Sequence, residues 1–361
     1  MRNGNLVKMP GLVDVHVHMR EPGAIYKEDW ESGTAAALAG GFTTVLAMPN
    51  TQPPICDEAS LTLALDAARR KARCDYGQFL GAGGENAELL PSLASRSVGL
   101  KMYLDQTYGP LRLDEMILWM AHFRHWPRQL PIVAHAEGKT IAAVILMAAF
   151  YDRSIHLAHI SRREEILLIR YAKEKGLPIT CEVTPHHLFL SEEHLPSLGA
   201  GFAEVRPTIA KQADRESLWE NLQVIDCFAT DHAPHTVNEK SAPNPPPGFP
   251  GLETALPLLL TAVQQNRLAL DEVVDRLYTQ PLRIFGLPLQ PETWIEVDLQ
   301  SNWEIHANQT YTRSGWTPFE GWKVQGRLHC VVLRGKVAFC DGEVLAPPGC
   351  GRNVRSRMDE I

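Results

Sequence analysis

The chain has 361 residues, with 35 Lys and Arg against 42 Asp and Glu, so its formal net charge is −7. Hydrophobic residues make up 45% of the chain, which excludes a largely disordered protein and fits one or two globular domains. The mild acidic excess argues against a nucleic-acid partner. The longest apolar stretches fall far short of the roughly 20 residues of a membrane span, so we expect no membrane association.

The seven cysteines are odd in number, widely scattered and form no CxxC motif. This usage predicts reduced thiols in a cytoplasmic protein, because disulfide frameworks and zinc fingers have regular cysteine spacing. The first ten residues contain no basic-then-apolar signal segment, in keeping with that location.

Short apolar runs rich in β-branched residues alternate with longer segments of helical spacing. The predicted strands are 12–18, 43–48, 75–80, 99–104, 132–135, 155–160, 179–183 and 224–230. The predicted helices between them are 58–73, 114–123, 140–150, 162–175 and 215–222, with a capping box at Ser161 and Glu164. Eight such units predict an α/β protein built on a TIM-type (β/α)8 barrel.

The pattern changes after the eighth strand. Five prolines in 241–251 exclude a helix or central strand and leave either a stiff surface loop or a wall of the active site. Helices are predicted at 252–264 and 271–277, followed by β-like segments around a turn at Asp341 and Gly342. We therefore expect a barrel over 10–287, a small β subdomain of the chain termini (1–9 and 288–350), and a disordered tail over 351–361.

The strongest chemical signal is His16-Val17-His18 at the end of the first strand. Residues i and i+2 of a strand face the same way, so the two imidazoles, with Asp14 two residues earlier, suggest half of a metal site. An HxH pair alone is weak evidence, because chance pairs are common.

Other metal-competent side chains arrive from other predicted strands. Lys101 lies in the fourth, His135 closes the fifth, His159 lies near the end of the sixth and Asp231 ends the eighth. The carboxyl ends of barrel strands meet at one face, where active sites of this fold lie. The competing interpretation is a set of hydrogen-bonded core histidines with a lysine that reaches solvent. An interior ammonium is costly, however, unless the amine is modified or unprotonated.

These residues lie in motifs that resemble one family. PGLVDVHVHMREPG (10–23), MPNT (48–51), GLKMYL (99–104), IVAHAE (132–137), ATDHAPH (229–235) and PPPGFPGLET (245–254) resemble dihydroorotase, a member of the amidohydrolase superfamily. The match runs from about residue 10 to about residue 348. It is closest to the dihydroorotase domain of the animal-type multifunctional pyrimidine-synthesis polypeptide, beside carbamoyl-phosphate synthetase and aspartate transcarbamoylase.

The resemblance implies a dinuclear zinc centre. His16, His18 and Asp231 would hold one Zn²⁺, His135 and His159 the other, and Lys101, carboxylated on its amine, would bridge the two together with a hydroxide. A carbamate at Lys101 removes the difficulty of a buried ammonium, because the modified group is an anion between two cations.

The resemblance also implies a substrate site. Arg20 and Asn50 would bind the substrate carboxylate, since a guanidinium suits a carboxylate. Arg206 and His235 would add polar contacts, the backbone near Pro247 and Gly248 would contact the ring edge, and Thr107 and Tyr108 would form a mobile lid. Asp231 would carry a proton between water and the ring nitrogen in the reversible cyclisation of N-carbamoyl-L-aspartate to L-dihydroorotate.

Position 158 is Ala, where some animal versions of this domain have a cysteine that helps hold a third zinc. We therefore assign Glu182 a supporting hydrogen-bonding role and not a third metal site. Two alternatives stay open: a dihydropyrimidinase or allantoinase type of cyclic amidohydrolase, and an inactive dihydroorotase-like scaffold. The family also suggests a homodimer, and the short N-terminal β segment suggests a domain embedded in a larger polypeptide.

Overall fold

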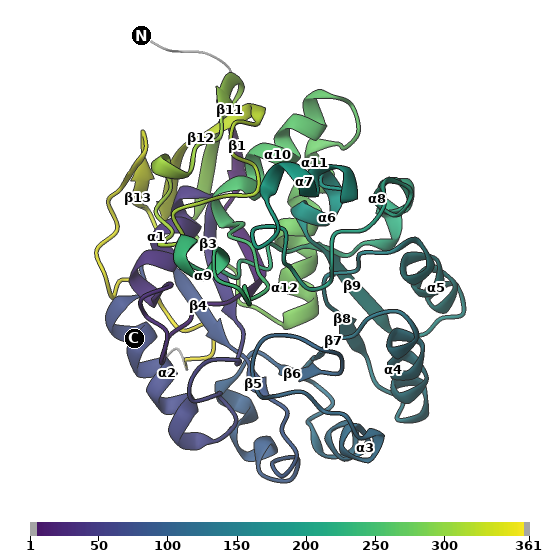
Figure 1. The fold of residues 1–361 in the computed structure, drawn as a ribbon. Helices are drawn as coiled ribbons and strands as arrows, with labels where there is room; N and C mark the ends of the chain where they lie inside the picture. Colours follow the sequence, from purple (N-terminus) through teal and green to yellow (C-terminus); the bar gives the residue numbers. More distant parts are fainter. Residues whose placement is uncertain (1–5, 357–361) are drawn as a thin grey trace.

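A ring of parallel strands, made of two sheets, forms the centre of the molecule, as the computed structural model of residues 6–356 shows (Figure 1). Its strands are β2 (Leu12–Val17), β3 (Phe42–Ala47), β4 (Asp75–Gln78), β5 (Leu80–Gly81), β6 (Leu100–Tyr103), β7 (Ile132–His135), β8 (Ile155–Leu157), β9 (Ile179–Val183) and β10 (Cys227–Phe228). Only Phe79 separates β4 from β5, so these two short strands occupy one position in the ring.

The first and last strands of the ring meet at the carboxyl end of β2. The backbone N–H of His18 donates to the carbonyl of His232 over 2.8 Å, and Val17 forms a parallel bridge with His232. Every other neighbouring pair in the ring is parallel. The predicted TIM-type barrel is therefore confirmed, and each predicted strand overlaps an observed one, with ends that differ by at most three residues.

Helices cover the outside of the ring (Figure 1). They are α1 (Trp30–Ala39), α2 (Glu58–Lys71), α3 (Met116–His125), α4 (Lys139–Phe150), α5 (Arg163–Glu174), α6 (Pro185–Phe189), α7 (Leu195–Leu198), α8 (Gln212–Glu220), α9 (Val237–Lys240), α10 (Leu252–Gln264), α11 (Leu270–Val274) and α12 (Gln280–Phe285). None of the helices within 6–356 has the length and hydropathy of a membrane span.

Helix α1 has no counterpart among the sequence predictions. It is rich in alanine and buried along most of its length, including Trp30 and Leu38, so it lacks the polar face that marks an amphipathic helix. Its first turn is fixed by Asp29, whose carboxylate accepts from the backbone N–H of Ser32 over 2.9 Å.

A further sheet joins the two ends of the chain. Its strands, in the order β1 (Leu6–Pro10), β11 (Trp294–Glu304), β12 (Lys323–Leu333), β13 (Lys336–Cys340) and β14 (Glu343–Val344), pair antiparallel. This is the predicted β appendage, with longer second and third strands than the sequence suggested. The division into a barrel over 10–287 and a subdomain of 1–9 and 288–350 stays a prediction, and residues 1–5 lie outside the described part.

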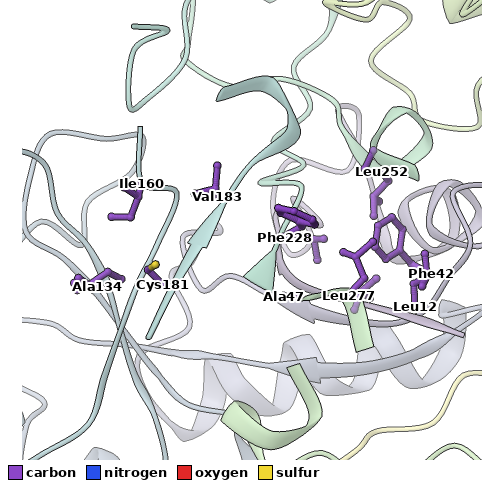
Figure 2. Close-up of a cluster of buried hydrophobic side chains, with 14 of the residues drawn as sticks. Leu12, Phe42, Ala47, Ala134, Ile160, Cys181, Val183, Phe228, Leu252 and Leu277 are labelled. Atoms are coloured by element: carbon purple, nitrogen blue, oxygen red, sulfur yellow. The ribbon is translucent and has the colours of Figure 1, made fainter. Parts of the chain in front are cut away.

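Two apolar layers enclose the strands. One lies between strands and helices, and Figure 2 shows part of it, including Leu12, Phe42 and Phe228. The other fills the inside of the barrel, where Val13 and Val15 pack in the same cluster as Phe285 of α12. Alternation along β6 follows from these layers: Leu100 and Met102 belong to the outer layer, which leaves Lys101 and Tyr103 for the interior.

Three local predictions are wrong. Helix α5 is capped by Arg162 and Glu165, one residue later than predicted, because Glu165 accepts from the backbone N–H groups of both Ser161 and Arg162. The predicted helix at 271–277 is a short α11 that continues as a π-helical turn over Asp275–Thr279 into α12.

The tail is the third. Residues 351–356, expected to be disordered, pack along the barrel: the backbone N–H of Val354 donates to Tyr76 over 2.9 Å. The Arg355 guanidinium donates to the carbonyl of Phe285 over 2.7 Å. The remaining tail residues, 357–361, lie outside the described residues.

Candidate metal and substrate site

The imidazoles of His16 and His18 lie side by side at the end of β2, with ring centroids 5.4 Å apart. Asp14 pairs with Val45 of β3, and Val17 pairs with Ala47. Strand β2 therefore has one more residue than β3 between these two pairs. This bulge breaks the alternation of side chains. Asp14, which simple alternation places with the histidines, accepts instead from the Thr230 hydroxyl over 2.5 Å and ties the first strand to the last.

Asp231 completes a buried group with these two histidines. Its Oδ1 lies 3.3 Å from Nε2 of His16 and 3.1 Å from Nε2 of His18. Burial favours the neutral carboxyl, but the nearby His16 and His18 imidazoles outweigh it and hold the pKa of Asp231 well below its usual range. Burial lowers the pKa of His18 to about 4, so His18 is neutral at neutral pH.

The hydrogen-bond partners of the two histidines fix which ring nitrogen bears the proton. Nδ1 of His16 contacts the Glu182 carboxylate, and Nδ1 of His18 lies 2.7 Å from Oδ1 of Asn50. Both partners accept, so each Nδ1 carries the hydrogen. Both Nε2 lone pairs therefore point at a carboxylate oxygen of Asp231. Three acceptors that converge in a buried place fit a bound cation.

A second histidine pair lies beside this group. Nδ1 of His135 is 2.7 Å from Nε2 of His159, and the His159 ring centroid lies 5.4 Å from that of His16. The remaining ring nitrogens of His135 and His159 are buried without a hydrogen-bond partner. Burial lowers the pKa of both imidazoles, which keeps them neutral and able to act as ligands.

Lys101 is buried on β6, and its Nζ has no hydrogen-bond partner among residues 6–356. Burial lowers the pKa of this amine from 10.5 to about 8, despite the attraction of Glu182 and Asp231. An orphaned, partly neutral amine is the form that reacts with CO₂, so this residue fits the bridging carbamate that the sequence motifs imply. The two histidine groups and Lys101 together offer the nitrogen and oxygen donors that Zn²⁺ prefers.

Glu182 supports the site from β9. Its carboxylate contacts Nδ1 of His16, lies 3.1 Å from Nε2 of His156 and accepts from the backbone N–H of His159 over 3.3 Å. Burial would raise the pKa of Glu182, but His16 and the His156 hydrogen bond lower it strongly, so it stays anionic. This is the supporting role that the sequence predicted.

Three non-glycine residues of the site have positive φ: Arg20 at 57°, His159 at 38° and Asp231 at 46°. Such backbone costs of the order of 1–3 kcal/mol per residue and is typical of functional sites. His159 follows the end of β8. Strict alternation from His156 would place its side chain outside the barrel, and the positive φ turns that side chain toward the interior.

Arg20 follows the metal-site histidines and is buried beside His235 and Tyr108. Its Nε donates to the carbonyl of Pro234 over 3.1 Å, and its guanidinium lies over the Tyr108 ring. Nη2 lies 3.0 Å from Nε2 of His235. Whether that last contact is a hydrogen bond depends on the tautomer of His235.

Lys27 decides this tautomer. Its ammonium, which has only hydrogens to donate, lies 2.7 Å from Glu239, 3.2 Å from Nδ1 of His235 and 3.3 Å from the Tyr108 hydroxyl. Burial and three nearby cations, Arg20, Lys27 and Lys240, lower the pKa of His235, so the ring is neutral. Nδ1 therefore accepts, Nε2–H donates to the carbonyl of Pro247 over 3.1 Å, and Nη2 of Arg20 is left without an acceptor there.

The lid candidates lie in the loop between β6 and α3. Nδ2 of Asn50 donates to the carbonyl of Tyr108 over 3.0 Å, and the Tyr108 ring lies edge-on to that of His235. Tyr108 therefore covers the Arg20 side of the site. Thr107 precedes it in the same loop, and its role stays a prediction.

The proline-rich segment forms a wall of the site, since the Pro247 carbonyl contacts His235. Lys240 holds this wall in place by donating to the carbonyls of Glu204 and Pro246 over 2.8 and 3.0 Å. Gly248 has φ 145°, and a Cβ there would lie 2.4 Å from the carbonyl oxygen of Ala233. Its N–H donates to Glu204 over 3.0 Å, so contact of this backbone with a ring edge stays a prediction.

Arg206 lies at the margin of the site. It is half-buried and donates to the carbonyl of Val205 over 2.9 Å. It is also close enough to Glu137 to help lower the pKa of that carboxyl, although burial opposes the shift and the His135 contacts contribute more. The structure thus places Arg206 near the second histidine pair, and its contact with substrate stays a prediction.

Two residues of the site were missed by sequence reasoning. Lys27 lies in an irregular loop, where no periodicity indicates its direction. Tyr103 could have been predicted from strand alternation, because it follows Lys101 by two residues on β6 and so faces the barrel interior as Lys101 does. Its hydroxyl is buried without a hydrogen-bond partner.

The amidohydrolase family model matches residues 7–287. The chain belongs to the amidohydrolase family. Among its relatives, the dihydroorotase of Pyrococcus furiosus is 35% identical over 364 residues, which cover 97% of this chain and 85% of that protein. The multifunctional protein CAD of Squalus acanthias is 56% identical over 99% of this chain, and the multifunctional protein pyr1-3 of Dictyostelium discoideum is 51% identical over 99%. The resemblance to dihydroorotase is thereby confirmed.

This amidohydrolase spans only 16% of the length of each of those two multifunctional relatives. Among solved structures, the L-hydantoinase of Arthrobacter aurescens superposes with a TM-score of 0.90 over 96% of this chain and 88% of its own. At 24% identity it supports the fold alone. The inactive dihydroorotase-like domain of a CAD-like protein from Chaetomium thermophilum has a TM-score of 0.83 and 29% identity, over 97% of this chain and 99% of that one.

Proposed function

We propose that this amidohydrolase is a dihydroorotase, which closes N-carbamoyl-L-aspartate to L-dihydroorotate with release of water and reopens the ring in the reverse direction. The observation that carries the proposal is the free Nη2 of Arg20, buried next to the histidine and Asp231 group. Dihydroorotate has a carboxylate outside its reacting amide, and a guanidinium beside the reacting centre binds such a group. The dihydroorotase relatives support the same assignment.

The metal-binding residues would be His16, His18 and Asp231 for one Zn²⁺ and His135 and His159 for the other, with carboxylated Lys101 between them. The converging lone pairs and the orphaned Lys101 amine described above support this arrangement. When bound, the two cations would polarise the reacting carbonyl and make water nucleophilic near neutral pH.

The chain's own residues would do the rest. Arg20 and Asn50 would hold the substrate carboxylate and so fix the direction of the reacting amide. Asp231, whose lowered pKa keeps it ionised, would accept a proton on one oxygen and return it to the ring nitrogen during hydrolysis. Tyr108, already packed on His235 and Arg20, would exclude water.

Two alternatives make different predictions. A hydantoinase or allantoinase acts on rings that need no carboxylate clamp, so the buried Arg20 would have no purpose there. The Chaetomium thermophilum domain is an inactive dihydroorotase-like domain, and turnover distinguishes an active enzyme from such a scaffold. The metal-competent residues all converge in this structure, which favours an active enzyme.

The wider context is also a proposal. We infer that the domain acts as part of a larger cytoplasmic pyrimidine-synthesis polypeptide, as the names of its multifunctional relatives suggest, and that it forms a homodimer.

The test is turnover by the purified chain supplied with zinc and bicarbonate. We expect ring opening of dihydroorotate and the reverse reaction, with dihydrouracil, hydantoin and allantoin turned over at least 100-fold more slowly. Preference for a ring without a carboxylate would contradict the substrate assignment. Full zinc occupancy without turnover of any of these rings would support the scaffold alternative.

A further inference from the structure

A second group of metal-binding side chains lies in the β12–β13 hairpin of the terminal sheet, which is separate from the barrel site. A ligand atom of His329, one of Cys340 and one of Asp341 all lie within 4.8 Å of one another. Nδ1 of His329 is 3.1 Å from Oδ1 of Asp341. Imidazole, thiolate and carboxylate together form a donor set typical of zinc.

A β-bulge brings these side chains together. Glu296 of β11 pairs with Cys330 and Val297 with Leu328, so His329 is an extra residue in β12. The bulge interrupts the alternation that would direct His329 and Cys330 to opposite faces of the sheet. A bulge that re-aims a side chain is typical of functional positions.

Cys330 lies next to this group, on the neighbouring strand of the hairpin. It pairs directly with Cys340, and the backbone N–H of Asp341 donates to the carbonyl of His329 over 3.0 Å. The Cys330–Cys340 pair is therefore a non-hydrogen-bonded one, in which the side chains approach most closely and Cα atoms are about 4.5 Å apart.

The surroundings suit a cation. A hollow of about 210 Å³ beside the hairpin is lined by His329 and Asp341 together with Asp298, Ser301 and Arg327, so solvent ions reach the His329 and Asp341 side of the group. Cys330 itself is buried, and the negative charges near it are those of Glu296 and Asp341. A cation would be attracted by these carboxylates and would displace the thiol proton of Cys340 on binding.

We propose that His329, Cys340 and Asp341 bind one divalent cation of the zinc class, which cross-links β12 to β13. This site has a sulfur donor, whereas the residues proposed for the barrel site include none. It therefore takes soft and borderline metals and has no part in the ring chemistry. The inference does not depend on the substrate proposed above.

The sulfur donor allows a selective test. The purified full chain, kept reduced with a phosphine, is titrated with Co²⁺, and thiolate-to-cobalt absorption is followed in the near ultraviolet. We expect the wild type to show this band and Cys340→Ser and His329→Ala to lose most of it. Turnover of dihydroorotate should stay within about twofold in both variants, which also shows that they fold.

Cys350→Ser is the matched control, since Cys350 is a half-buried free thiol elsewhere on the chain. This variant should keep the band. The proposal is wrong if the reduced wild type shows no thiolate band at saturating Co²⁺, or if Cys340→Ser retains it. A hairpin that has formed a Cys330–Cys340 disulfide must also recover the band on reduction, and failure to do so contradicts the site.

Discussion

The ammonium of Lys27 lies 3.2 Å from Nδ1 of His235 and decides which nitrogen of that imidazole bears the proton. As a consequence, Nε2–H of His235 faces Pro247, and Nη2 of Arg20 keeps its hydrogens for a ligand. Lys27, a buried cation, thus leaves the Arg20 guanidinium free to bind a ligand.

Replacement of Lys27 by Met should weaken substrate binding more than chemistry. Without the ammonium, His235 can adopt the other tautomer and accept from Arg20, which removes a donor from the carboxylate site. We expect the KM for dihydroorotate to rise about tenfold, equivalent to one hydrogen bond of about 1.4 kcal/mol, with kcat changed much less. Nitrogen chemical shifts of His235 would show the tautomer directly. Lys173→Met, which removes an ion pair with Asp226 on the far side of the barrel, should leave KM unchanged.

Arg20→Ala should lose the carboxylate clamp itself. Removal of one partner of a buried charge pair weakens binding by about 2–5 kcal/mol. The kcat/KM for dihydroorotate should therefore fall at least ~30-fold. The weak turnover of dihydrouracil, which has no carboxylate, should change little. Near-normal turnover of dihydroorotate by this variant would mean that the substrate has been misassigned.

Lys101→Ala should abolish activity and lower the zinc content, because no other side chain on β6 can bridge the two histidine groups. Tyr103→Phe is the matched control on the same strand and interior face, and it should retain the metal. Elemental analysis of both variants after dialysis against trace zinc measures this. If Lys101→Ala kept two metals and the full rate, the carbamate role would have to be abandoned.

Glu239→Gln should change the pH dependence of stability. The Lys27 ion pair and further hydrogen bonds outweigh burial and lower the pKa of Glu239 below 4.5 in the folded chain. The unfolded chain therefore takes up this proton first as pH falls, so the stabilisation is complete above about pH 5 and is lost through the lower, folded pKa. We expect the variant to be less stable than wild type by roughly 1 kcal/mol at pH 7 and by less at pH 4, where part of the stabilisation has been lost.

Urea unfolding at the two pH values measures this difference. Glu174→Gln on the outer face of α5 serves as the control and should give equal differences at both. A constant deficit of Glu239→Gln from pH 7 to pH 4 would contradict the ion-pair explanation.

The barrel and much of the site were predictable because each signal is local. Eight apolar runs separated by helical segments define the ring, and the positions of His135 and Asp231 at strand ends follow from the same pattern. Lys101 could be recognised because burial of an ammonium within an apolar strand is energetically unfavourable, which points to a modified or unprotonated amine.

The errors have local physical causes. Strand alternation placed Asp14 with the histidines, but the bulge in β2 directs it to Thr230. The tail over 351–356 has no hydrophobic period, yet its backbone bonds to Tyr76 at the barrel surface. Lys27 was missed because its partners, His235 and Glu239, are more than 200 residues away in sequence and no local pattern connects them.

Diffraction from crystals of the zinc-loaded enzyme, recorded at the zinc absorption edge, tests the central claim most directly. The account predicts two anomalous peaks in the barrel mouth, one among His16, His18 and Asp231 and the other at His135 and His159. It also predicts density that continues past Nζ of Lys101 toward both peaks. Absence of those peaks in zinc-saturated crystals, or Lys101 density that ends at the amine, would contradict it.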